Sequence, residues 1–353
     1  MNTPQTIYIV QTAFLGDVVL TLPLCAALRG LYPGARIIFI TTPSAAEFLR
    51  GLSVVDEVVA FDKRRDHRSI SSLRALASSI RADGPTVAIV PHKSLRSALF
   101  VQSLRADVVV TFKDALTRWI ATHAVEYPVR AHDTNRHLAL LLPLLPLGSR
   151  IPEVSSLLPI DLRASDESNS INVWDANSTA PRIVLAPATV WPTKQWPVER
   201  MRDLAERCLH EGYQVVVIGD ASVRGCMDAI VGVNDQIGKT TLRQAASIIA
   251  GADCVVANDS APVHLASMQN VKTVAIFGPT IPEFGFGPLG VRSRVVQRND
   301  LSCRPCSAHG GTSCPIRTHE CMTGIDVDTV FAALQSTLAH DVNRHAKPPE
   351  TTF

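Results

Sequence analysis

The stretch of residues 254–280 constrains the fold more than any other part of the sequence. It opens with a short apolar run at 254–257 and closes with another at 274–277, and neither run alternates apolar with polar residues. Such continuous runs are typical of parallel strands that are covered on both faces. Between them, Asn-Asp-Ser at 258–260 breaks the pattern, and Ser260 is a favoured N-cap residue for a helix. The stretch therefore predicts a strand, a turn, a helix and a second strand of an open α/β sheet.

This turn is a candidate anion site. The first backbone N–H groups of a helix have no partner within the helix and carry its positive dipole end, so a diphosphate fits there. Open α/β sheets also bind ligands at the carboxyl ends of their strands, where this turn is expected. An ordinary capped strand–helix turn is the alternative that the residues leave open.

The composition is that of a globular protein with room for two hydrophobic cores. The 353 residues are 46% hydrophobic and 19% charged, and the net charge of +2 gives no nucleic-acid footprint. The first residues lack the basic start and apolar core of a signal peptide, and no run of about 20 apolar residues could span a bilayer. We therefore expect a cytoplasmic protein, in which the eight cysteines form no disulfide framework.

Strand patterns alternate with helical patterns along most of the chain, which predicts parallel βαβ units. One series occupies 1–165 and another 180–325, with a polar linker at 149–181 and a last amphipathic helix within 326–345. We expect an α/β fold with two open domains whose parallel sheets face each other across a cleft. The expected strands are 7–11, 36–41, 54–61, 86–91, 107–112, 182–187, 214–219, 254–257 and 274–277, and the expected helices are 16–29, 44–52, 69–81, 94–105, 198–211, 241–250 and 326–340.

The first predicted strand–helix turn carries a single glycine, Gly16, followed by Asp17. Gly16 allows a tight turn, but a dinucleotide-binding turn would need G-x-G-x-x-G here. Because a carboxylate repels phosphate, Asp17 suits a general base better than a phosphate ligand. The alternative is that Asp17 only complements the positive end of the helix dipole.

The loop at 187–197 directly follows another predicted strand and contains two tryptophans. Lys194 in this loop can neutralise a diphosphate, and Thr189 and Thr193 offer hydroxyl groups as hydrogen-bond donors. The alternative is a solvated surface lysine, which is the usual position of this residue type.

Four motifs in this order resemble glycosyltransferase family nine, the ADP-heptose:lipopolysaccharide heptosyltransferases, and most closely its heptosyltransferase II type. They are G-D at 16–17, K-x-W-P at 194–197, N-D-S-x-x-x-H-L-A at 258–266 and F-G-P-T at 277–280. Each motif is short, but their order and spacing extend over nearly the whole chain. The resemblance implies a GT-B fold, with two Rossmann-like domains that bind the acceptor and the nucleotide sugar respectively.

The resemblance also implies the chemistry. Asp17 would deprotonate the acceptor hydroxyl, which attacks the anomeric carbon and inverts its configuration. Lys194 and the helix N-terminus at Ser260 and Ala261 would stabilise the departing diphosphate without an obligatory metal. Many members have glycine where this chain has Ala261, which still leaves an N–H group. The implied donor-binding residues are Thr189, Thr193, Lys194, Asp259, Ser260, Ala261 and His264; a core position is the alternative for His264.

The implied acceptor is the inner core of lipopolysaccharide, which is anionic. Between residues 86 and 137 the basic side chains exceed the acidic ones by 7 − 4 = 3. We expect Lys93 and Arg96 to bind acceptor phosphates, and the excess charge to favour transient contact with the inner face of the cytoplasmic membrane. An ordinary solvated surface is the alternative.

Half of the cysteines lie in one short stretch, with the spacing C-x2-C-x7-C-x6-C. Such a cluster in a cytosolic protein is a candidate structural zinc site, here formed by Cys303, Cys306, Cys314 and Cys321. A reduced, metal-free cluster is the alternative. In either case we expect the cluster to brace a loop and take no part in catalysis.

The expected function is the transfer of heptose from ADP-heptose to lipopolysaccharide. A sugar-nucleotide epimerase of the same fold is the second possibility, because a fold does not fix the chemistry. An epimerase would need further acid and base groups in the first domain. A non-catalytic nucleotide-sugar-binding module is the third, and it would have no use for Asp17 as a base.

Overall fold

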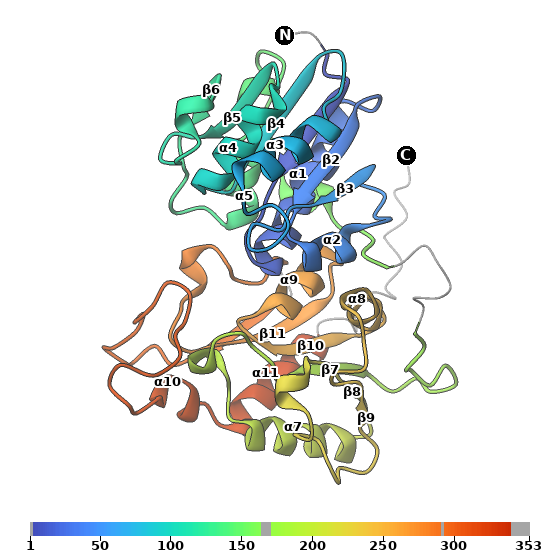
Figure 1. Cartoon of the computed structure of the whole chain (residues 1–353). Helices are drawn as coiled ribbons and strands as arrows, with labels where there is room; N and C mark the ends of the chain where they lie inside the picture. Colours follow the sequence, from blue (N-terminus) through green and yellow to red (C-terminus); the bar gives the residue numbers. More distant parts are fainter. Residues whose placement is uncertain (1–2, 164–170, 291–292, 340–353) are drawn as a thin grey trace, which may run out of the picture. The chain divides into compact units, whose positions relative to one another are not determined.

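The structure is a computed structural model of the chain and describes residues 3–163, 171–290 and 293–339 (Figure 1). The chain forms two compact units. The first contains Met1–Ser170, Leu242–Ser247 and Glu283–Phe286, and the second contains Ile171–Thr241, Ile248–Pro282 and Gly287–Phe353. Each unit is built on one six-stranded sheet whose paired strands all run parallel.

The sheet of the first unit has the strand order β3-β2-β1-β4-β5-β6. Its strands are β1 (Thr6–Val10), β2 (Arg36–Thr41), β3 (Glu57–Ala60), β4 (Thr86–Val90), β5 (Val108–Phe112) and β6 (His123–Val125). β1 lies between β2 and β4, so Ile7 is in register with Ile37 on one side and with Val87 on the other. The order of strands therefore reverses its direction between β1 and β4.

Helices cover both faces of this sheet, because successive residues of each strand point to opposite faces and both sets must be buried. Tyr8 and Val10 pack against α3 (Ile70–Ser79) and α4 (Leu95–Leu104), which lie side by side in front of the sheet in Figure 1. The intervening Ile7 and Ile9 are also fully buried and point to the opposite face. The remaining helices are α1 (Leu15–Leu31), α2 (Pro43–Leu49), α5 (Asp133–Ala139) and α6 (Val154–Leu157), with 3-10 turns η1 (Arg118–Ile120) and η2 (Leu142–Leu144).

The second unit repeats this plan with the strand order β12-β11-β10-β7-β8-β9. Its strands are β7 (Arg182–Ala186), β8 (Gln214–Val217), β9 (Asn234–Asp235), β10 (Cys254–Asn258), β11 (Lys272–Phe277) and β12 (Arg294–Gln297). β10 pairs with β7 and β11, so the order reverses between β10 and β7.

One core of the second unit packs beneath α7 (Val198–His210) and α11 (Val327–Ala339). Trp196 is the largest fully buried side chain and donates its Nε1–H to the carbonyl of Ile325 at 3.0 Å. The other helices are α8 (Leu242–Ala250), α9 (Ala261–Met268) and α10 (Glu320–Thr323), with 3-10 turns η4 (Pro192–Lys194), η5 (Ala221–Val223) and η6 (Pro282–Phe284).

The expected α/β fold with two parallel sheets is confirmed. Most expected elements agree with the structure to within a few residues, and the strand at 36–41 has the predicted bounds. Three edge strands, β6, β9 and β12, were not predicted because they are short and carry polar residues. The predicted linker includes α6, and its residues 164–170 lie outside the described part, as does the chain after residue 339.

Candidate active site

Polar side chains gather at the carboxyl ends of the strands beside each reversal of strand order. In open α/β sheets this is the place where ligands bind, because the loops on either side of the reversal diverge and leave space between them. In the second unit the reversal lies between β10 and β7, and in the first unit between β1 and β4. The second unit carries the predicted donor residues, and the first carries Asp17.

Lys194, Asp259 and Thr280 form a buried polar group at the reversal in the second unit, here called the Lys194 triad. The Lys194 Nζ lies 2.6 Å from Asp259 Oδ2, and the Thr280 hydroxyl donates to the same oxygen at 2.6 Å. The side chains of Lys194 and Asp259 are only 12% and 5% exposed. The structure therefore brings two predicted donor residues together and adds Thr280 from the F-G-P-T motif.

The triad keeps binding capacity for a substrate. An ammonium group has three donors, so Lys194 can bind phosphate oxygens while it keeps its ion pair. In the described part of the chain, both contacts to the Asp259 carboxylate use Oδ2, so Oδ1 can accept a sugar hydroxyl. The ion pair with Asp259 holds the Lys194 ammonium in place, so little reorganisation is needed when a diphosphate binds.

Ser260 is the N-cap residue of α9, as predicted, but its side chain does not cap the helix. Its hydroxyl faces the carbonyls of Asn258 and Ala188, at 3.2 and 3.4 Å. The N-terminus of α9, which starts with Ala261, thus has no side-chain cap and suits an anionic ligand. This is the helix terminus that the sequence predicted as an anion site.

Asn258 was missed by the sequence analysis as a structural residue. It is fully buried, donates from Nδ2 to the carbonyl of Pro187 at 2.8 Å and accepts from the backbone N–H of Trp196 at 3.0 Å. It therefore joins the end of β10 to both ends of the loop that carries Lys194. Its place directly after a buried strand was the signal that could have identified it.

Three further predicted donor residues lie in the second unit. His264 is 5% exposed within α9, which agrees with the alternative of a core position. Thr189 is half-buried, and its hydroxyl lies 3.4 Å from the backbone nitrogen of Trp191. Thr193 is 5% exposed and its hydroxyl is bonded to the backbone of Gly311, so this hydroxyl is occupied within the protein.

Asp17 lies in the first turn of α1, after the end of β1. The residue is half-buried, and its backbone carbonyl accepts from Thr21 Oγ1 at 2.8 Å. The Thr21 hydroxyl also lies 3.2 Å from His137 Nδ1 of α5, which braces this turn. Gly16 is the second residue of α1, in agreement with the predicted helix 16–29, and the chain turns before it, between β1 and α1. Whether Asp17 faces the Ser260 turn stays a prediction.

A second polar group, here called the His92 cluster, lies at the carboxyl ends of β1 and β4. His92 Nδ1 is 2.7 Å from Thr12 Oγ1, and Lys63 Nζ donates to Ser94 and Ser97 at 2.9 and 3.2 Å. Burial, assisted by the charge of Lys63, lowers the pKa of His92 to about 4. Burial and the charge of Arg96 lower the pKa of Lys63 to about 8.

The predicted acceptor residues Lys93 and Arg96 are both engaged within the first unit. Lys93 Nζ lies 2.6 Å from Asp114 Oδ2 and 3.3 Å from the centre of the Tyr127 ring. Arg96 donates to the backbone carbonyls of Lys63 and Arg68. The Lys93 ammonium and the Arg96 guanidinium are therefore not fully available to a phosphate.

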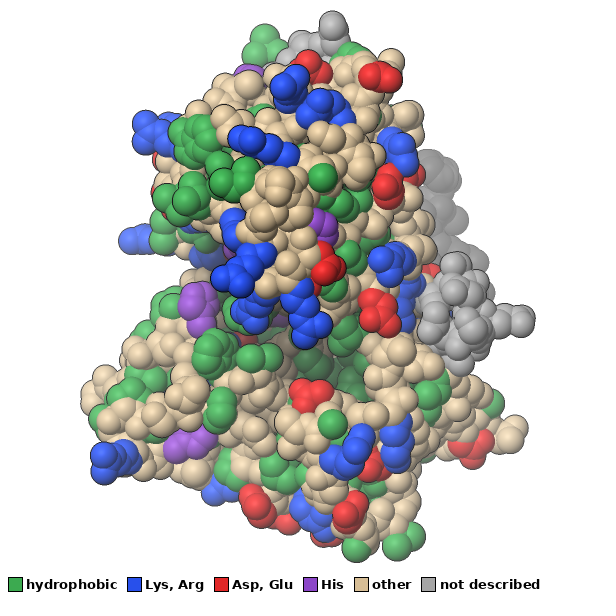
Figure 2. Space-filling model, in the orientation of Figure 1, with side chains coloured by type: hydrophobic (Ala, Val, Ile, Leu, Met, Phe, Trp, Pro, Cys, Tyr) green, Lys and Arg blue, Asp and Glu red, His purple; other side chains and the backbone are tan. Residues whose placement is uncertain are grey.

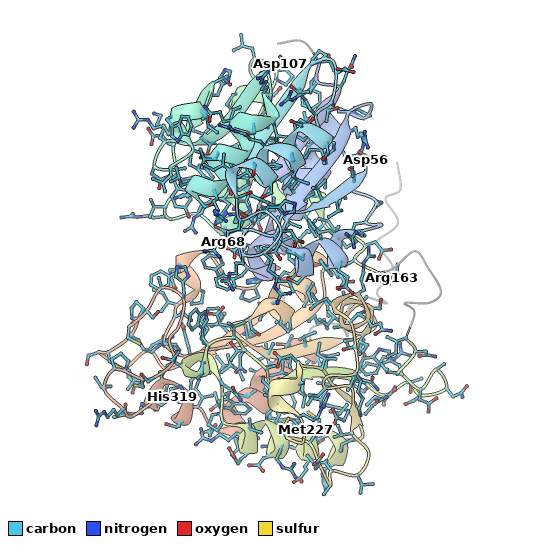
Figure 3. The ribbon with its side chains drawn as sticks, in the orientation of Figure 1. Asp56, Arg68, Asp107, Arg163, Met227 and His319 are labelled. Carbon is cyan, nitrogen blue, oxygen red and sulfur yellow. The ribbon has the colours of Figure 1, made fainter. Side chains whose placement is uncertain are left out.

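Arg96 instead shapes a basic loop, residues 62–68, that the sequence analysis did not single out. Arg64, Arg65 and Arg68 in this loop are exposed. Figure 2 shows Lys and Arg side chains gathered over this part of the first unit, where Figure 3 labels Arg68. The run of basic residues in K-R-R-D-H-R was the available signal.

The four clustered cysteines are free thiols in this structure. Among the described residues, no three His, Cys, Asp or Glu side chains are arranged to hold a metal ion. The thiols are near enough for the charges of the other three to help raise the pKa of Cys321 to about 11, although burial is the main cause. The zinc site stays a prediction that metal analysis of the purified protein would test.

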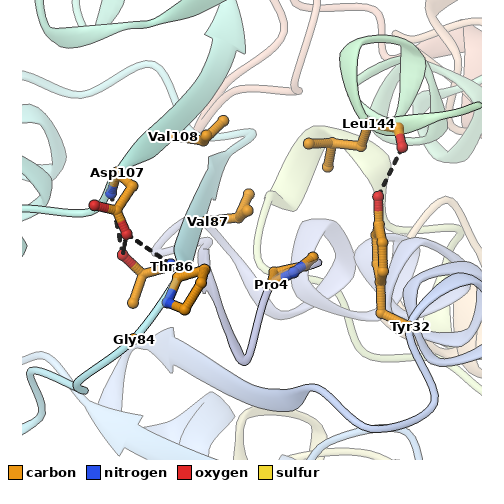
Figure 4. A pocket seen from close by; sticks show the side chains of 9 residues that line it. Pro4, Tyr32, Gly84, Thr86, Val87, Asp107, Val108 and Leu144 are labelled. Carbon is orange, nitrogen blue, oxygen red and sulfur yellow. Dashed lines mark hydrogen bonds between the residues drawn. The ribbon is translucent and has the colours of Figure 1, made fainter. Parts of the chain in front are cut away.

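A pocket of about 350 Å³ lies at the opposite edge of the first sheet, at the amino ends of β1, β4 and β5 (Figure 4). Pro4, Tyr32, Val87, Val108 and Leu144 give it mostly apolar walls. The polar groups on it are largely engaged: Tyr32 donates to the carbonyl of Leu144 at 2.7 Å, and Thr86 donates to Asp107. It therefore offers few available polar groups, and it lies at the amino ends of the strands, whereas this class of sheet binds substrates at the carboxyl ends.

No helix in residues 3–163, 171–290 or 293–339 combines the length and the apolar character required to cross a bilayer.

The two doubly wound parallel sheets, with polar groups at both reversals of strand order, define an α/β protein of the class that binds nucleotides at its strand ends. The family described as "Glycosyltransferase family 9 (heptosyltransferase)" matches residues 73–314, well over half of the chain. The chain belongs to this family and is a glycosyltransferase, which confirms the resemblance.

Individual relatives agree with the family. The chain is 25% identical to lipopolysaccharide heptosyltransferase 2 of Escherichia coli K12 over 317 residues, which cover 82% of this chain and 87% of the relative. A glycosyltransferase of family 9 from Veillonella parvula has a similar structure, with a TM-score of 0.78, 23% identity and coverage of 96% and 99%. The Escherichia coli heptosyltransferase WaaC, solved with ADP-2-deoxy-2-fluoro heptose, gives a TM-score of 0.69 at 17% identity and covers 94% and 99%. At these identities the two structures establish the GT-B fold.

Proposed function

We propose that the protein transfers heptose from ADP-heptose to the inner core of lipopolysaccharide, with inversion at the anomeric carbon. The observation that carries this proposal is the Lys194 triad beside the uncapped N-terminus of α9. This pairing puts the Lys194 ammonium beside the positive dipole end of α9 and the N–H of Ala261, as a departing diphosphate requires. Pro262 has no N–H group, and that of Val263 donates to the carbonyl of Ser260. The relatives named above act as heptosyltransferases or hold an ADP-heptose analogue, and this supports the choice of donor.

In the second unit, Lys194 and the N-terminus of α9, with the N–H of Ala261, stabilise the negative charge that develops on the diphosphate. They do so without an obligatory metal, because the ammonium and the oriented backbone dipoles already supply the positive charge that is needed. Asp259 positions a hydroxyl of the sugar through Oδ1. Thr280 keeps the Asp259 carboxylate in place by its hydrogen bond to Oδ2.

In the first unit, Asp17 is the general base that removes the proton of the attacking hydroxyl. Its place in the first turn of α1, after β1, is the position at which this class of sheet binds a substrate. Arg64, Arg65 and Arg68 on the basic loop, with Lys63 behind them, attract the phosphate groups of the acceptor. Lys93 and Arg96 act mainly by holding this side of the unit in shape.

The protein also makes transient contact with the inner membrane surface, through a patch that we call the Trp119 turn. It consists of Leu116, Arg118 and Trp119 around η1, and the two apolar side chains are 60% and 54% exposed. The turn is anchored, because Thr117 is fully buried and its hydroxyl lies 2.5 Å from Thr111 Oγ1. Exposed tryptophan beside arginine suits the interface of an anionic bilayer.

The neighbourhood of this turn agrees with such a surface. Figure 2 shows hydrophobic side chains gathered beside Lys and Arg over the part of the first unit that contains β5 and β6. Lys113 is paired with Glu126, whereas the exposed Arg118 makes no ion pair with any described residue. Its charge is therefore available to lipid phosphates.

Release of ADP from ADP-heptose, measured with and without a lipid A–core acceptor, separates the candidate functions. Acceptor-dependent release supports transfer. Tight donor binding without release would support a non-catalytic binding module, and interconversion of the sugar nucleotide without acceptor would support an epimerase.

Asp17→Asn tests the assignment of the base. The amide has nearly the same shape but cannot accept the proton, so we expect turnover to fall at least about 100-fold while ADP binding is unchanged. Turnover is measured by ADP release and binding by calorimetry. Asp56→Asn, at an exposed ion pair with Arg29 of the same unit, is the control and should keep full activity. Preserved turnover in Asp17→Asn would refute this role.

A further inference from the structure

The cysteine-rich segment, residues 303–321, is bonded to the loop that carries Lys194. The contact is made by Thr193, the residue directly before Lys194. Its backbone N–H and its hydroxyl donate to the carbonyl of Gly311 at 3.2 and 3.0 Å, and the hydroxyl accepts from the N–H of Gly311 at 2.8 Å. Thr193 is 5% exposed, so these bonds are shielded from water.

A second bond fixes the peptide group between Thr193 and Lys194. His319 Nε2 lies 2.7 Å from the carbonyl oxygen of Thr193. A carbonyl oxygen only accepts, so His319 carries its proton on Nε2 and donates it. The orientation of this peptide determines where the Lys194 side chain starts.

The segment approaches this loop closely at Gly310. Its φ of +98° is unfavourable for other residues, and an added Cβ would lie 2.8 Å from the Cβ of Trp191. Trp191 is the residue before η4, which ends at Lys194. The contact between the segment and the loop is thus tight as well as hydrogen-bonded.

The same segment is bonded to the other side of the Lys194 triad. Arg304 donates to the carbonyl of Thr280 at 2.9 Å and to the carbonyl of Gly278. The backbone N–H of Cys306 donates to the carbonyl of Pro279 at 3.1 Å. Residues 303–321 therefore hold both the turn that provides Thr280 and the loop that provides Lys194.

We propose that Thr193 and His319 are positioning residues that fix the Lys194 loop through the cysteine-rich segment, so that the Lys194 ammonium meets the diphosphate of the donor. This inference rests on the proposed function, in which Lys194 binds that diphosphate. A lysine side chain has high rotamer entropy, and a fixed backbone lowers the cost of placing its charge. Thr193 is accordingly a support of the donor site and not a ligand of the nucleotide sugar.

Thr193→Val and Thr193→Ser form the first test. Valine has the shape of threonine without the hydroxyl, whereas serine keeps it. We expect Thr193→Val to raise the dissociation constant of ADP and the KM of the donor about 5- to 10-fold, with the KM of the acceptor unchanged. Thr193→Ser should restore both values to within about twofold. Equal behaviour of the two variants would overturn the role of the hydroxyl.

His319→Leu and His319→Gln form the second test, at a site that is less buried than Thr193. Leucine removes the donor, and glutamine keeps an N–H donor on a side chain of similar reach. We expect the same selective loss of donor affinity in His319→Leu, about 3- to 10-fold, and its partial recovery in His319→Gln. The control is His309→Ala in the same segment. His309 is exposed, and its ring makes no hydrogen bond within the described residues, so ADP binding should not change.

The outcomes separate this inference from the proposed function. If the unaltered protein does not bind ADP, the proposed function fails, and the positioning role fails with it. If it binds ADP and both Thr193→Val and His319→Leu bind equally well, only the positioning role is overturned. A fall in kcat of Thr193→Val and His319→Leu with no change in the donor KM would also overturn the positioning role, because it would indicate a loss of stability only.

Discussion

At the scale of single residues, His92 illustrates how burial changes the chemistry of a side chain. Its ring is held against Thr12 and lies near the ammonium of Lys63, and its pKa is lowered from 6.5 to about 4. Between these two pKa values, His92 is therefore protonated in the unfolded chain but neutral in the folded protein. This difference makes the free energy of unfolding depend on pH.

The direction of that dependence follows from the number of bound protons. Between pH 6.5 and about 4 the unfolded state binds the proton of His92 and the folded state does not, so the free energy of unfolding falls as the pH falls. We expect His92→Asn, which keeps a polar atom near Thr12, to flatten the curve in this window. Urea unfolding at several pH values measures it. His309→Asn at an exposed position should leave the slope as it is, and an unchanged slope in His92→Asn would contradict the assignment.

Lys194 and Asp259 show the other way in which a buried charge is tolerated. Both side chains are nearly buried and each neutralises the other at 2.6 Å. Removing water from two charges costs free energy that a close ion pair recovers only in part. A pair of this kind is therefore better explained by the function of the charges than by the stability of the fold.

At the scale of the elements, the end of β10 holds the donor site together. Asn258 there connects β10 to Pro187 after β7 and to Trp196 before α7. No hydrophobic contact could replace these hydrogen bonds, because they satisfy the buried carbonyl of Pro187 and the buried N–H of Trp196.

We expect Asn258→Ala to lower the free energy of unfolding by at least about 2 kcal/mol, since two buried backbone groups lose their partners. Tryptophan fluorescence during urea unfolding measures the change. Asn177→Ala at an exposed site is the control and should change stability by no more than about 0.5 kcal/mol. A similar small change in Asn258→Ala would mean that water or neighbouring groups replace the amide.

The order of strands and helices could be predicted from the sequence because buried parallel strands such as 36–41 are continuous apolar runs. The edge strand at 123–125 could not, since it has only three residues, of which His123 and Ala124 are half-buried and Val125 is buried. The helix predicted from Gly16 onward begins one residue earlier, at Leu15. Local patterns thus predict elements well where burial is uniform.

The candidate site was only partly predictable. Lys194, Asp259 and Ser260 could be named from their positions after strands and from the family motifs. The bond from Thr280 to Asp259, and those from Gly311 and His319 to Thr193, join residues 21, 118 and 126 positions apart. No local pattern encodes such pairings, because they depend on how the whole unit folds.

At the scale of the whole molecule, the charge is distributed unevenly although the total is only +2. Ion pairs neutralise Lys93 and Lys113, whereas Arg118 beside Leu116 and Trp119 remains exposed. Binding to a membrane would then depend on a few residues and not on the net charge.

We expect the protein to bind vesicles with an anionic lipid fraction more tightly than neutral ones, and added salt to weaken this binding. Arg118→Ser should lower the partition coefficient about fivefold, as expected for one basic residue at such a surface, and Trp119→Ser should lower it further. Co-sedimentation with vesicles measures both. Val231→Ser, at an exposed apolar residue of the second unit, is the control. Equal binding by all variants would exclude the Trp119 turn as the contact.

The pocket between Tyr32 and Asp107 has a practical consequence. It opens at the amino ends of the strands, whereas Asp17 follows the carboxyl end of β1, so a small fragment seated there would not compete with a ligand bound beside Asp17. Such a fragment would be detected by a rise in melting temperature, and by the same argument it would leave the KM of the acceptor unchanged.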